Sequence, residues 1–234
     1  MSNLQKVLAI DGPCGSGKSS IALMVSSRLK ALHVDTGSLY RGISYFLDSK
    51  KIDFNDEKKV DSTLKEISIE YGKSNDELII INDLNLTQLI REHRVSHLAS
   101  EVSKIPIVRE FLLGIQRQIV DKRFCVMEGR DIGTVVFPKA FCKVYLTASV
   151  DVRAQRRFDQ LEQLGNASKM SLEQVLEDVR QRDQKDMRRE LAPLKQAEDA
   201  FLIDSSELNE EQVIDRICDM VQQKAQEYGI NIQS

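Results

Sequence analysis

The stretch VLAIDGPCGSGKSSIALMVSSRL at residues 7–29 decides the fold that we expect for this chain. The apolar residues 7–10 lead into a glycine-rich turn, and apolar residues then recur at helical spacing from Ile21 to Leu29. This order predicts a buried strand, a loop and a helix. Within it, residues 12–19, GPCGSGKS, match the pattern G-x-x-x-x-G-K-[ST] at every fixed position.

A loop of this pattern is suited to binding nucleotide phosphates. Its glycines let backbone N–H groups turn toward phosphate oxygens, and the N-terminus of the following helix adds partial positive charge. Lys18 is expected to reach the β and γ phosphates, and Ser19 to offer its hydroxyl to Mg²⁺. The alternative, a glycine-rich turn without a ligand, is disfavoured by the strand before the loop and the helix after it. The predicted nucleotide-binding residues of the loop are Gly12, Pro13, Cys14, Gly15, Ser16, Gly17, Lys18, Ser19 and Ser20.

Length, charge and cysteine content exclude several classes of protein. With 234 residues and a net charge of -3, the chain can bury one substantial core and has no overall basic surface for nucleic acid. The four cysteines are far apart and the three histidines form no ligand motif with them, so neither zinc nor a disulfide framework is predicted. No apolar run has the length of a signal peptide or a membrane span. We therefore expect a cytoplasmic protein with no nucleic-acid or membrane partner.

The rest of the chain alternates between strand and helix patterns. Further buried strands are expected around Val34 and at residues 125–128, 143–146 and 201–204, with helical patterns between them. This alternation predicts an α/β fold with a parallel sheet covered by helices. The pattern changes at about 52–100, where SIEYG and ELIII are typical of a hairpin turning at Lys73–Asp76, and we interpret this region as an inserted subdomain. Pro106 is expected to interrupt the helical pattern that follows.

The charged stretch 151–191 predicts two arginine-rich helices joined around Gly165–Lys169. Arg182, Asp186 and Arg189 are spaced i, i+4 and i+7, so they share one helix face that could meet phosphates and a pentose. A solvated, ion-paired surface is the alternative reading of such a helix. We favour that alternative for Arg180 and Arg188.

Further motifs give the sequence a specific resemblance. They are VDTGSLYRG at 34–42, VMEGRDIGTVVFP at 126–138, R-x-R-D-x-x-D at 180–186 and APL at 192–194. Together with the phosphate loop, they make the chain similar to the bacterial cytidylate kinase family over essentially its whole length. The resemblance implies ATP-dependent phosphorylation of CMP and dCMP. A switch GTPase is disfavoured because no [NT]-K-x-D segment occurs.

The resemblance also assigns roles to individual residues. It implies that acceptor phosphate is bound by Thr36, Tyr40, Arg41 and Arg130, and cytosine by Ser100, Arg109 and Asp131. It implies that Arg182 and Arg189 meet the transferring phosphates, that Asp186 accepts from the pentose hydroxyls, and that Arg157 contributes to ATP binding. The expected catalytic residues are Lys18, Arg130, Arg182 and Arg189.

Three positions depart from the family pattern around the metal. Glu128 ends a predicted strand where the family has Asp, and we expect it to reach Mg²⁺ through water. Ser19 and Ser20 stand where the family often has Gly-Thr. On spacing, Ser19 is the expected metal ligand.

The resulting prediction is a single kinase domain over 1–234, with ATP and Mg²⁺ as cofactors. It has a core at 1–51 and 101–234, an acceptor-binding insertion at about 52–100 and a lid at about 153–189, and we expect a monomer. The alternatives are a kinase for UMP or another nucleoside monophosphate, and a non-catalytic phosphate-loop regulator that binds nucleotide without transferring phosphate.

Overall fold

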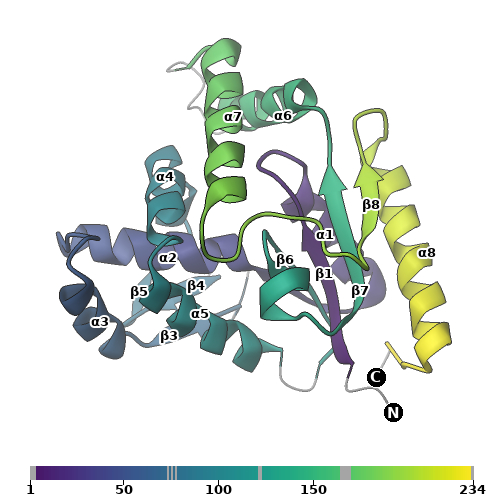
Figure 1. Ribbon diagram of the computed structural model, residues 1–234, viewed down its shortest axis with the longest axis horizontal. Coiled ribbons are helices and arrows are strands. Elements are labelled where there is room, and N and C mark those ends of the chain that lie inside the picture. Colours follow the sequence, from purple (N-terminus) through teal and green to yellow (C-terminus); the bar gives the residue numbers. More distant parts are fainter. Residues whose placement is uncertain are drawn as a thin grey trace. The chain divides into compact units, whose positions relative to one another are not determined.

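The structure is a computed structural model that describes residues 4–72, 74, 76, 78–120, 123–163 and 170–232. The chain divides into two compact units, and the elements of both are labelled in Figure 1. The first unit comprises Met1–His33 with Lys122–Ser234, and the second comprises Val34–Asp121.

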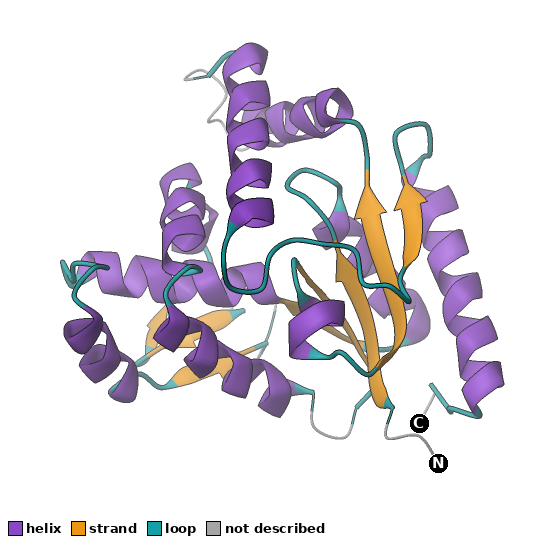
Figure 2. Cartoon of the chain, in the orientation of Figure 1, coloured by secondary structure: helices purple, strands orange, loops and turns teal. Residues whose placement is uncertain are grey.

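A five-stranded sheet forms the centre of the first unit, in the order β2-β6-β1-β7-β8. Strand β1 pairs in parallel with both β6 and β7, and β7 pairs in parallel with β8. This sheet, flanked by helices in Figure 2, confirms the predicted α/β class. The strands are β1 (Gln5–Asp11), β2 (Leu32–Asp35), β6 (Cys125–Gly129), β7 (Ala140–Thr147) and β8 (Phe201–Asp204), and the last two residues of β2 belong to the second unit.

Helices α1 and α8 pack against this sheet in one apolar core. Val25 of α1, Leu8 of β1 and Ile217 of α8 are all fully buried in it, because each helix presents one apolar stripe to the strands. Figure 1 shows α8 alongside β7 and β8. The helical elements of the first unit are α1 (Lys18–Leu29), the π-helical turn η2 (Ile132–Val136), α6 (Val150–Gln163), α7 (Leu172–Arg188) and α8 (Glu210–Tyr228).

Local sequence signals fix where several of these helices begin and end. Helix α7 starts at a capping box in which Ser171 and Gln174 each satisfy the other's backbone N–H. Helix α1 ends at Leu29 because Lys30 adopts a left-handed conformation, with φ 52°. The predicted join between α6 and α7, Gly165–Lys169, lies outside the described residues.

The second unit is built on a three-stranded antiparallel sheet of order β3-β4-β5. The segments expected to form a hairpin are paired as β3 and β4, whereas the expected turn at Lys73–Asp76 includes residues outside the described part. Pro106 is the first residue of α5, where a missing N–H costs nothing. The elements are α2 (Thr36–Ser49), α3 (Glu57–Lys65), β3 (Ile69–Tyr71), β4 (Ile79–Ile81), β5 (Leu84–Asn85), η1 (Leu89–Arg91), α4 (His93–Val102) and α5 (Pro106–Ile119).

Helix α2 supplies much of the core of the second unit. Leu39, Ile43 and Leu47 recur every four residues and are fully buried, in one cluster with Ile79 and Ile81 of β4. The predicted insertion at about 52–100 lies within this unit, which begins earlier and ends later in the chain. Within the described residues, no helix has the length and apolar character needed to cross a membrane.

Two glycine substitutions test the packing of the fold in opposite directions. A Cβ at Gly12 would lie 2.0 Å from the backbone oxygen of Leu146, whereas a Cβ at Gly114, inside α5, would meet nothing within 4 Å. Gly12→Ala should lower the free energy of unfolding by about 2 kcal/mol or more. Gly114→Ala should raise it by about 0.5–1 kcal/mol, because alanine loses less backbone entropy in a helix. Urea denaturation of the ligand-free protein measures both, and equal effects would contradict the predicted packing.

Candidate active site

The phosphate loop leaves β1 at Gly12 and enters α1 at Lys18. Lys18 is only 6% exposed, and its Nζ donates to Pro13 O at 2.7 Å and to Ser16 Oγ at 3.3 Å. The ammonium group is therefore held inside the loop by the loop's own oxygens. Ser19 and Ser20, the next two predicted residues, are exposed on the first turn of α1.

The environment of Lys18 disfavours its positive charge. Burial, and to a smaller extent the nearby Arg130 guanidinium, lowers the pKa of Lys18 from 10.5 to about 7. The carboxylate of Glu128 acts in the opposite direction. The nearby carboxylates therefore compensate the buried charge of Lys18 only in part. An anionic ligand close to Lys18 would favour the protonated ammonium.

Ser19 and Glu128 lie side by side, as the predicted metal site requires. The Ser19 hydroxyl donates to Glu128 Oε2 at 2.9 Å, and Glu128 is buried near the end of β6. On the other side of this carboxylate, His33 Nε2 lies 3.6 Å from Oε1. A hydroxyl and a carboxylate are oxygen donors of the kind that Mg²⁺ prefers.

Two consecutive residues after β6 form ion pairs with α7 and the residue that follows it. Arg130 Nε donates to Asp186 Oδ2 at 2.8 Å, and Asp131 Oδ1 lies 3.5 Å from Arg189 Nη2. The side chains of Asp131 and Arg189 are 7% and 6% exposed, so this pair is almost fully buried. Four predicted site residues that are far apart in sequence are thus brought together within the first unit.

The ion pair between Arg130 and Asp186 accompanies shifted pKa values of both members. Burial alone would raise the pKa of Asp186, but the nearby arginines, Arg130 foremost, together outweigh it and the net pKa is lowered. Burial likewise opposes the charge of Arg130, yet Asp186 holds its pKa above the ordinary value. Both groups are therefore charged at neutral pH, and an incoming phosphate would compete with Asp186 for the guanidinium.

The remaining arginines of the first unit differ in exposure. Arg182 is partly buried and its charge contributes to lowering the pKa of Asp186, whereas Arg180 and Arg188 are exposed. Arg157, predicted to contribute to ATP binding, donates to Gln160 Oε1 of its own helix at 2.6 Å.

Another group of predicted residues lies in the second unit, at the start of α2. Asp35 caps this helix by accepting from Ser38 N at 3.1 Å, and its other carboxylate oxygen accepts from Arg41 Nη2 at 2.7 Å. Thr36, the first residue of α2, is buried. Sequence reasoning missed the role of Asp35 in capping α2 and binding Arg41. An Asp directly before a helical pattern is nevertheless a recognisable N-cap signal.

Tyr40 and Arg109, predicted for acceptor phosphate and base, are in contact within the same unit. The Arg109 guanidinium lies 5.8 Å from the centre of the Tyr40 ring, a cation–π geometry, and its Nη1 donates to Ser103 O at 3.2 Å. Ser100 accepts through its backbone oxygen from Ser103 Oγ at 3.0 Å. These contacts fix Arg109 next to α4 and α2.

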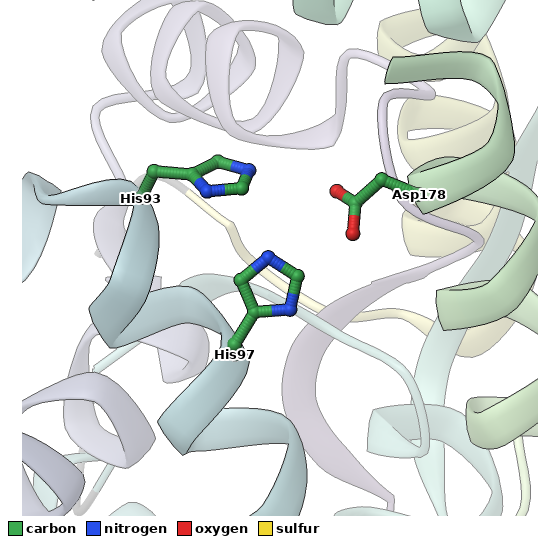
Figure 3. Close-up of side chains that lie close together, drawn as sticks. All are labelled: His93, His97 and Asp178. Atoms are coloured by element: carbon green, nitrogen blue, oxygen red, sulfur yellow. The ribbon is translucent and has the colours of Figure 1, made fainter. Parts of the chain in front are cut away.

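The histidines of α4 form an aromatic pair. The rings of His93 and His97 lie 4.7 Å apart in an edge-to-face arrangement, as drawn in Figure 3. Asp178, also labelled there, belongs to α7 of the first unit. Two imidazoles are fewer than the three or four protein ligands of a typical zinc site, so this pair alone does not define one.

Sequence reasoning also missed polar contacts that hold the phosphate loop and the segment after β6. Asp11 accepts from the backbone N–H groups of Ile132 and Gly133, at 2.8 Å each. Asp183 and Arg153, for which the sequence analysis predicted no individual role, both contact the backbone of Cys14. An acid that ends an apolar strand could have signalled Asp11, but nothing in the spacing signals the other two.

A parallel sheet whose first strand enters a phosphate loop with a buried lysine defines a phosphate-loop nucleotide-binding protein. Comparison with known proteins then narrows the class. The family model described as cytidylate kinase matches residues 8–223, and the chain belongs to this family of phosphotransferases, which use ATP as phosphate donor.

Two curated relatives show how the chain compares with whole proteins. The cytidylate kinase of Geobacillus sp. (strain WCH70) is 40% identical over 218 residues, which cover 93% of this chain and 96% of that protein. The bifunctional pantoate ligase/cytidylate kinase of Prochlorococcus marinus (strain MIT 9312) is 41% identical over 221 residues. That match covers 93% of this chain but only 43% of that protein.

Similarity to a solved structure supports the fold alone. The crystal structure of an uncharacterized protein from Eubacterium ventriosum matches with a TM-score of 0.51 and 8% identity. The match covers 92% of this chain and 98% of that chain.

The pKa of Lys18 predicts how stability depends on pH. Because the folded-state pKa is lowered from 10.5 to about 7, the unfolded chain binds a proton more tightly between these pH values. Lys18 therefore destabilises the ligand-free fold fully below pH 7, and this cost disappears as pH rises toward 10.5. The gain in unfolding free energy on Lys18→Met should be largest below pH 7 and shrink above it, measured by urea denaturation across this range. Parallel wild-type and variant curves would show that Lys18 titrates normally.

Proposed function

We propose that this chain transfers the γ-phosphoryl group of ATP to CMP and dCMP, producing ADP with CDP or dCDP. The observation that carries the proposal is the pair Arg130 and Asp131, which follow β6 and are each ion-paired with a residue at the end of α7. One offers a guanidinium to phosphate and the other a carboxylate to an amino group, so the unit contains both chemistries that a cytidine monophosphate requires. The family match over residues 8–223 and the cytidylate kinase relative that covers 93% of the chain support the same substrate class.

The donor nucleotide is assigned to the phosphate loop. Backbone N–H groups of the loop and the buried Lys18 ammonium would meet the β and γ phosphates, whose negative charge would favour protonation of Lys18. Ser19 and Glu128 would hold Mg²⁺, with Glu128 acting through water, and the ion would neutralise charge on the phosphates. Arg157 of α6 is proposed as a further ATP contact.

In the first unit, the acceptor is assigned to the ion-paired residues. Arg130, Arg182 and Arg189 would bind phosphate oxygens, since planar guanidinium groups can hold two oxygens at once. Asp131 would accept from the exocyclic amine of cytosine, and Asp186 from the pentose hydroxyls. Arg130 and Arg189 already have a carboxylate near them, so binding there exchanges one anionic partner for another rather than desolvating a lone cation.

In the second unit, Thr36, Tyr40 and Arg41 are proposed to bind acceptor phosphate, and Ser100 and Arg109 to bind the base. The contacts of Arg41 with Asp35 and of Arg109 with Tyr40 would hold these guanidinium groups ready. This is the role that we propose for the inserted region at about 52–100 and its flanking helices. The two helices at about 153–189 are proposed to act as the lid.

Catalysis on this proposal is positioning and charge neutralisation. The acceptor phosphate is already a nucleophile near neutral pH, so no covalent intermediate with the protein is needed. Lys18 and the three arginines would stabilise negative charge that spreads over the transferring group. Exclusion of water by the lid would prevent hydrolysis of ATP. We further propose a cytoplasmic monomer.

Acceptor-dependent ADP release tests the proposal directly. CMP and dCMP should support faster turnover than UMP or a purine monophosphate at equal concentration. Preference for UMP would favour the alternative kinase, and nucleotide binding with no acceptor-dependent turnover would favour a non-catalytic regulator.

Replacement of Asp131 should alter selectivity for the base. In Asp131→Asn the carboxylate that accepts from the cytosine amine becomes an amide that can also donate to uracil. We expect the CMP-to-UMP ratio of kcat/KM to fall by about tenfold or more, the worth of one charge-assisted hydrogen bond. Asp186→Asn is the matched control and should affect both acceptors alike. An unchanged ratio in Asp131→Asn would mean that Asp131 does not recognise the base.

The arginines of α7 and its C-terminus should separate by exposure. Arg182→Lys and Arg189→Lys keep the positive charge but lose the planar fork, and each should lower kcat by about tenfold or more. Arg180→Lys and Arg188→Lys are controls at exposed positions and should change kcat by less than about threefold. Steady-state turnover with CMP measures all four. Equal, small effects would support a solvated surface, and a large loss at Arg188 alone would mean that another helix face is functional.

A further inference from the structure

An ion pair between two helices holds one residue of the phosphate loop, Cys14, through both of its backbone polar groups. The N–H of Cys14 donates to Asp183 Oδ1 at 3.2 Å, and the carbonyl oxygen of Cys14 accepts from Arg153 Nη1 at 2.9 Å. The same Arg153 nitrogen donates to Asp183 Oδ2 at 2.5 Å. Asp183 and Arg153 thus bind each other as well as both backbone polar groups of Cys14.

This arrangement is buried and its polar groups are well matched. Arg153 lies on α6 and Asp183 on α7, and their side chains are 8% and 9% exposed. Arg153 Nε donates in addition to Ala148 O at 2.9 Å. A Cβ at Gly15 would lie 2.6 Å from the backbone oxygen of Arg153, so the loop packs directly on the backbone of α6.

One turn further along α6, a second arginine contacts the loop. Arg156 Nη1 approaches Ser16 O at 3.4 Å, and its Nη2 donates to Ser205 O at 2.8 Å. Because residues three apart share one helix face, α6 contacts the loop at two peptides, Cys14 and Ser16. The loop is therefore fixed in orientation at its centre as well as at its junctions with β1 and α1.

Stability alone does not account for a buried ion pair at this position. An apolar pair of similar volume usually stabilises a fold as well or better, because burying two charges costs solvation free energy. Here, the pair matches the backbone donor and the backbone acceptor of a single loop residue. Its effect is to fix the direction of the N–H groups that follow Cys14, which is what an anion site of preorganised dipoles needs.

We propose that Arg153 and Asp183 are positioning residues for the donor nucleotide. They hold the backbone of Cys14 so that the loop N–H groups converge on phosphate. Because Arg153 lies on α6 and Asp183 on α7, the direction of these N–H groups depends on how the two helices pack. Neither residue touches the nucleotide. The inference rests on the proposed function, because it takes an adenine nucleotide as the ligand of the loop. It adds that α6 and α7 control the affinity of the loop for that nucleotide.

The test measures ADP binding by calorimetry on the full chain, with no acceptor present. Asp183→Asn keeps an oxygen for the Cys14 N–H but removes the charge that orients Arg153, and Arg153→Lys keeps the charge but loses the fork. Each single substitution should weaken ADP binding by about tenfold. The double variant should bind ADP about as well as the weaker-binding single variant, because both side chains act through the backbone of Cys14. The affinity for CMP should change by less than about threefold.

Controls matched in residue type use the exposed ion pair between Arg28, in the last turn of α1, and Asp215 of α8. Arg28→Lys and Asp215→Asn change the same residue types and should leave ADP affinity unchanged. Unchanged ADP affinity in folded Asp183→Asn and Arg153→Lys, or equal losses for ADP and CMP, would overturn the proposal. If Asp183→Asn does not fold, Arg153→Lys decides, since it keeps the buried charge. If the wild type binds ADP but does not phosphorylate CMP, the proposed function fails while this comparison still stands.

Discussion

The carboxylate of Asp11 ties the phosphate loop to the segment that follows β6. Its two oxygens accept from the backbone N–H groups of Ile132 and Gly133, at 2.8 Å each. Burial raises the pKa of Asp11 to about 6, although these two hydrogen bonds act to lower it. Asp11 immediately precedes the loop, and Ile132 immediately follows Arg130 and Asp131. One buried side chain therefore sets the position of the loop relative to the two residues proposed to recognise the acceptor.

Around this junction, the first unit gathers opposite charges, and the charge of Lys18 is compensated only in part. Arg130 and Arg189 each have a carboxylate near them, whereas Lys18 is held mainly by neutral oxygens of the loop and has a lowered pKa. A site arranged in this way gains most from a ligand that brings negative charge to the loop. Nucleotide phosphates satisfy that requirement, and the arginines can exchange carboxylate for phosphate without a large change in solvation.

The sequence was sufficient for those features that depend on local pattern. The order of β1, loop and α1 follows from the apolar run and the glycines, and the greater burial of Arg182 than of Arg180 agrees with helical spacing. The expected helical position of Arg189 was wrong, because α7 ends at Arg188 and the backbone of Arg189 is extended. Local sequence patterns did not predict the contacts between segments that are far apart in the chain. Asp183 is adjacent to Arg182 in a charge-rich helix, and nothing local distinguishes an acid that binds the backbone of Cys14 from one that faces water. Likewise, the π-helical turn η2 depends on Asp11 far away in the chain, so residues 132–136 alone do not predict it.

The central claim is that phosphate moves from ATP to a cytidine monophosphate, and following the phosphoryl group itself tests this most directly. With ATP labelled at the γ position and CMP in excess over the protein, the label should appear in CDP, with the loss of labelled ATP dependent on CMP. Phosphorus NMR or chromatography of the products distinguishes the species. The account predicts labelled CDP and little inorganic phosphate, since water is excluded from the transfer. Label released mainly as inorganic phosphate, at a rate indifferent to CMP, would contradict it.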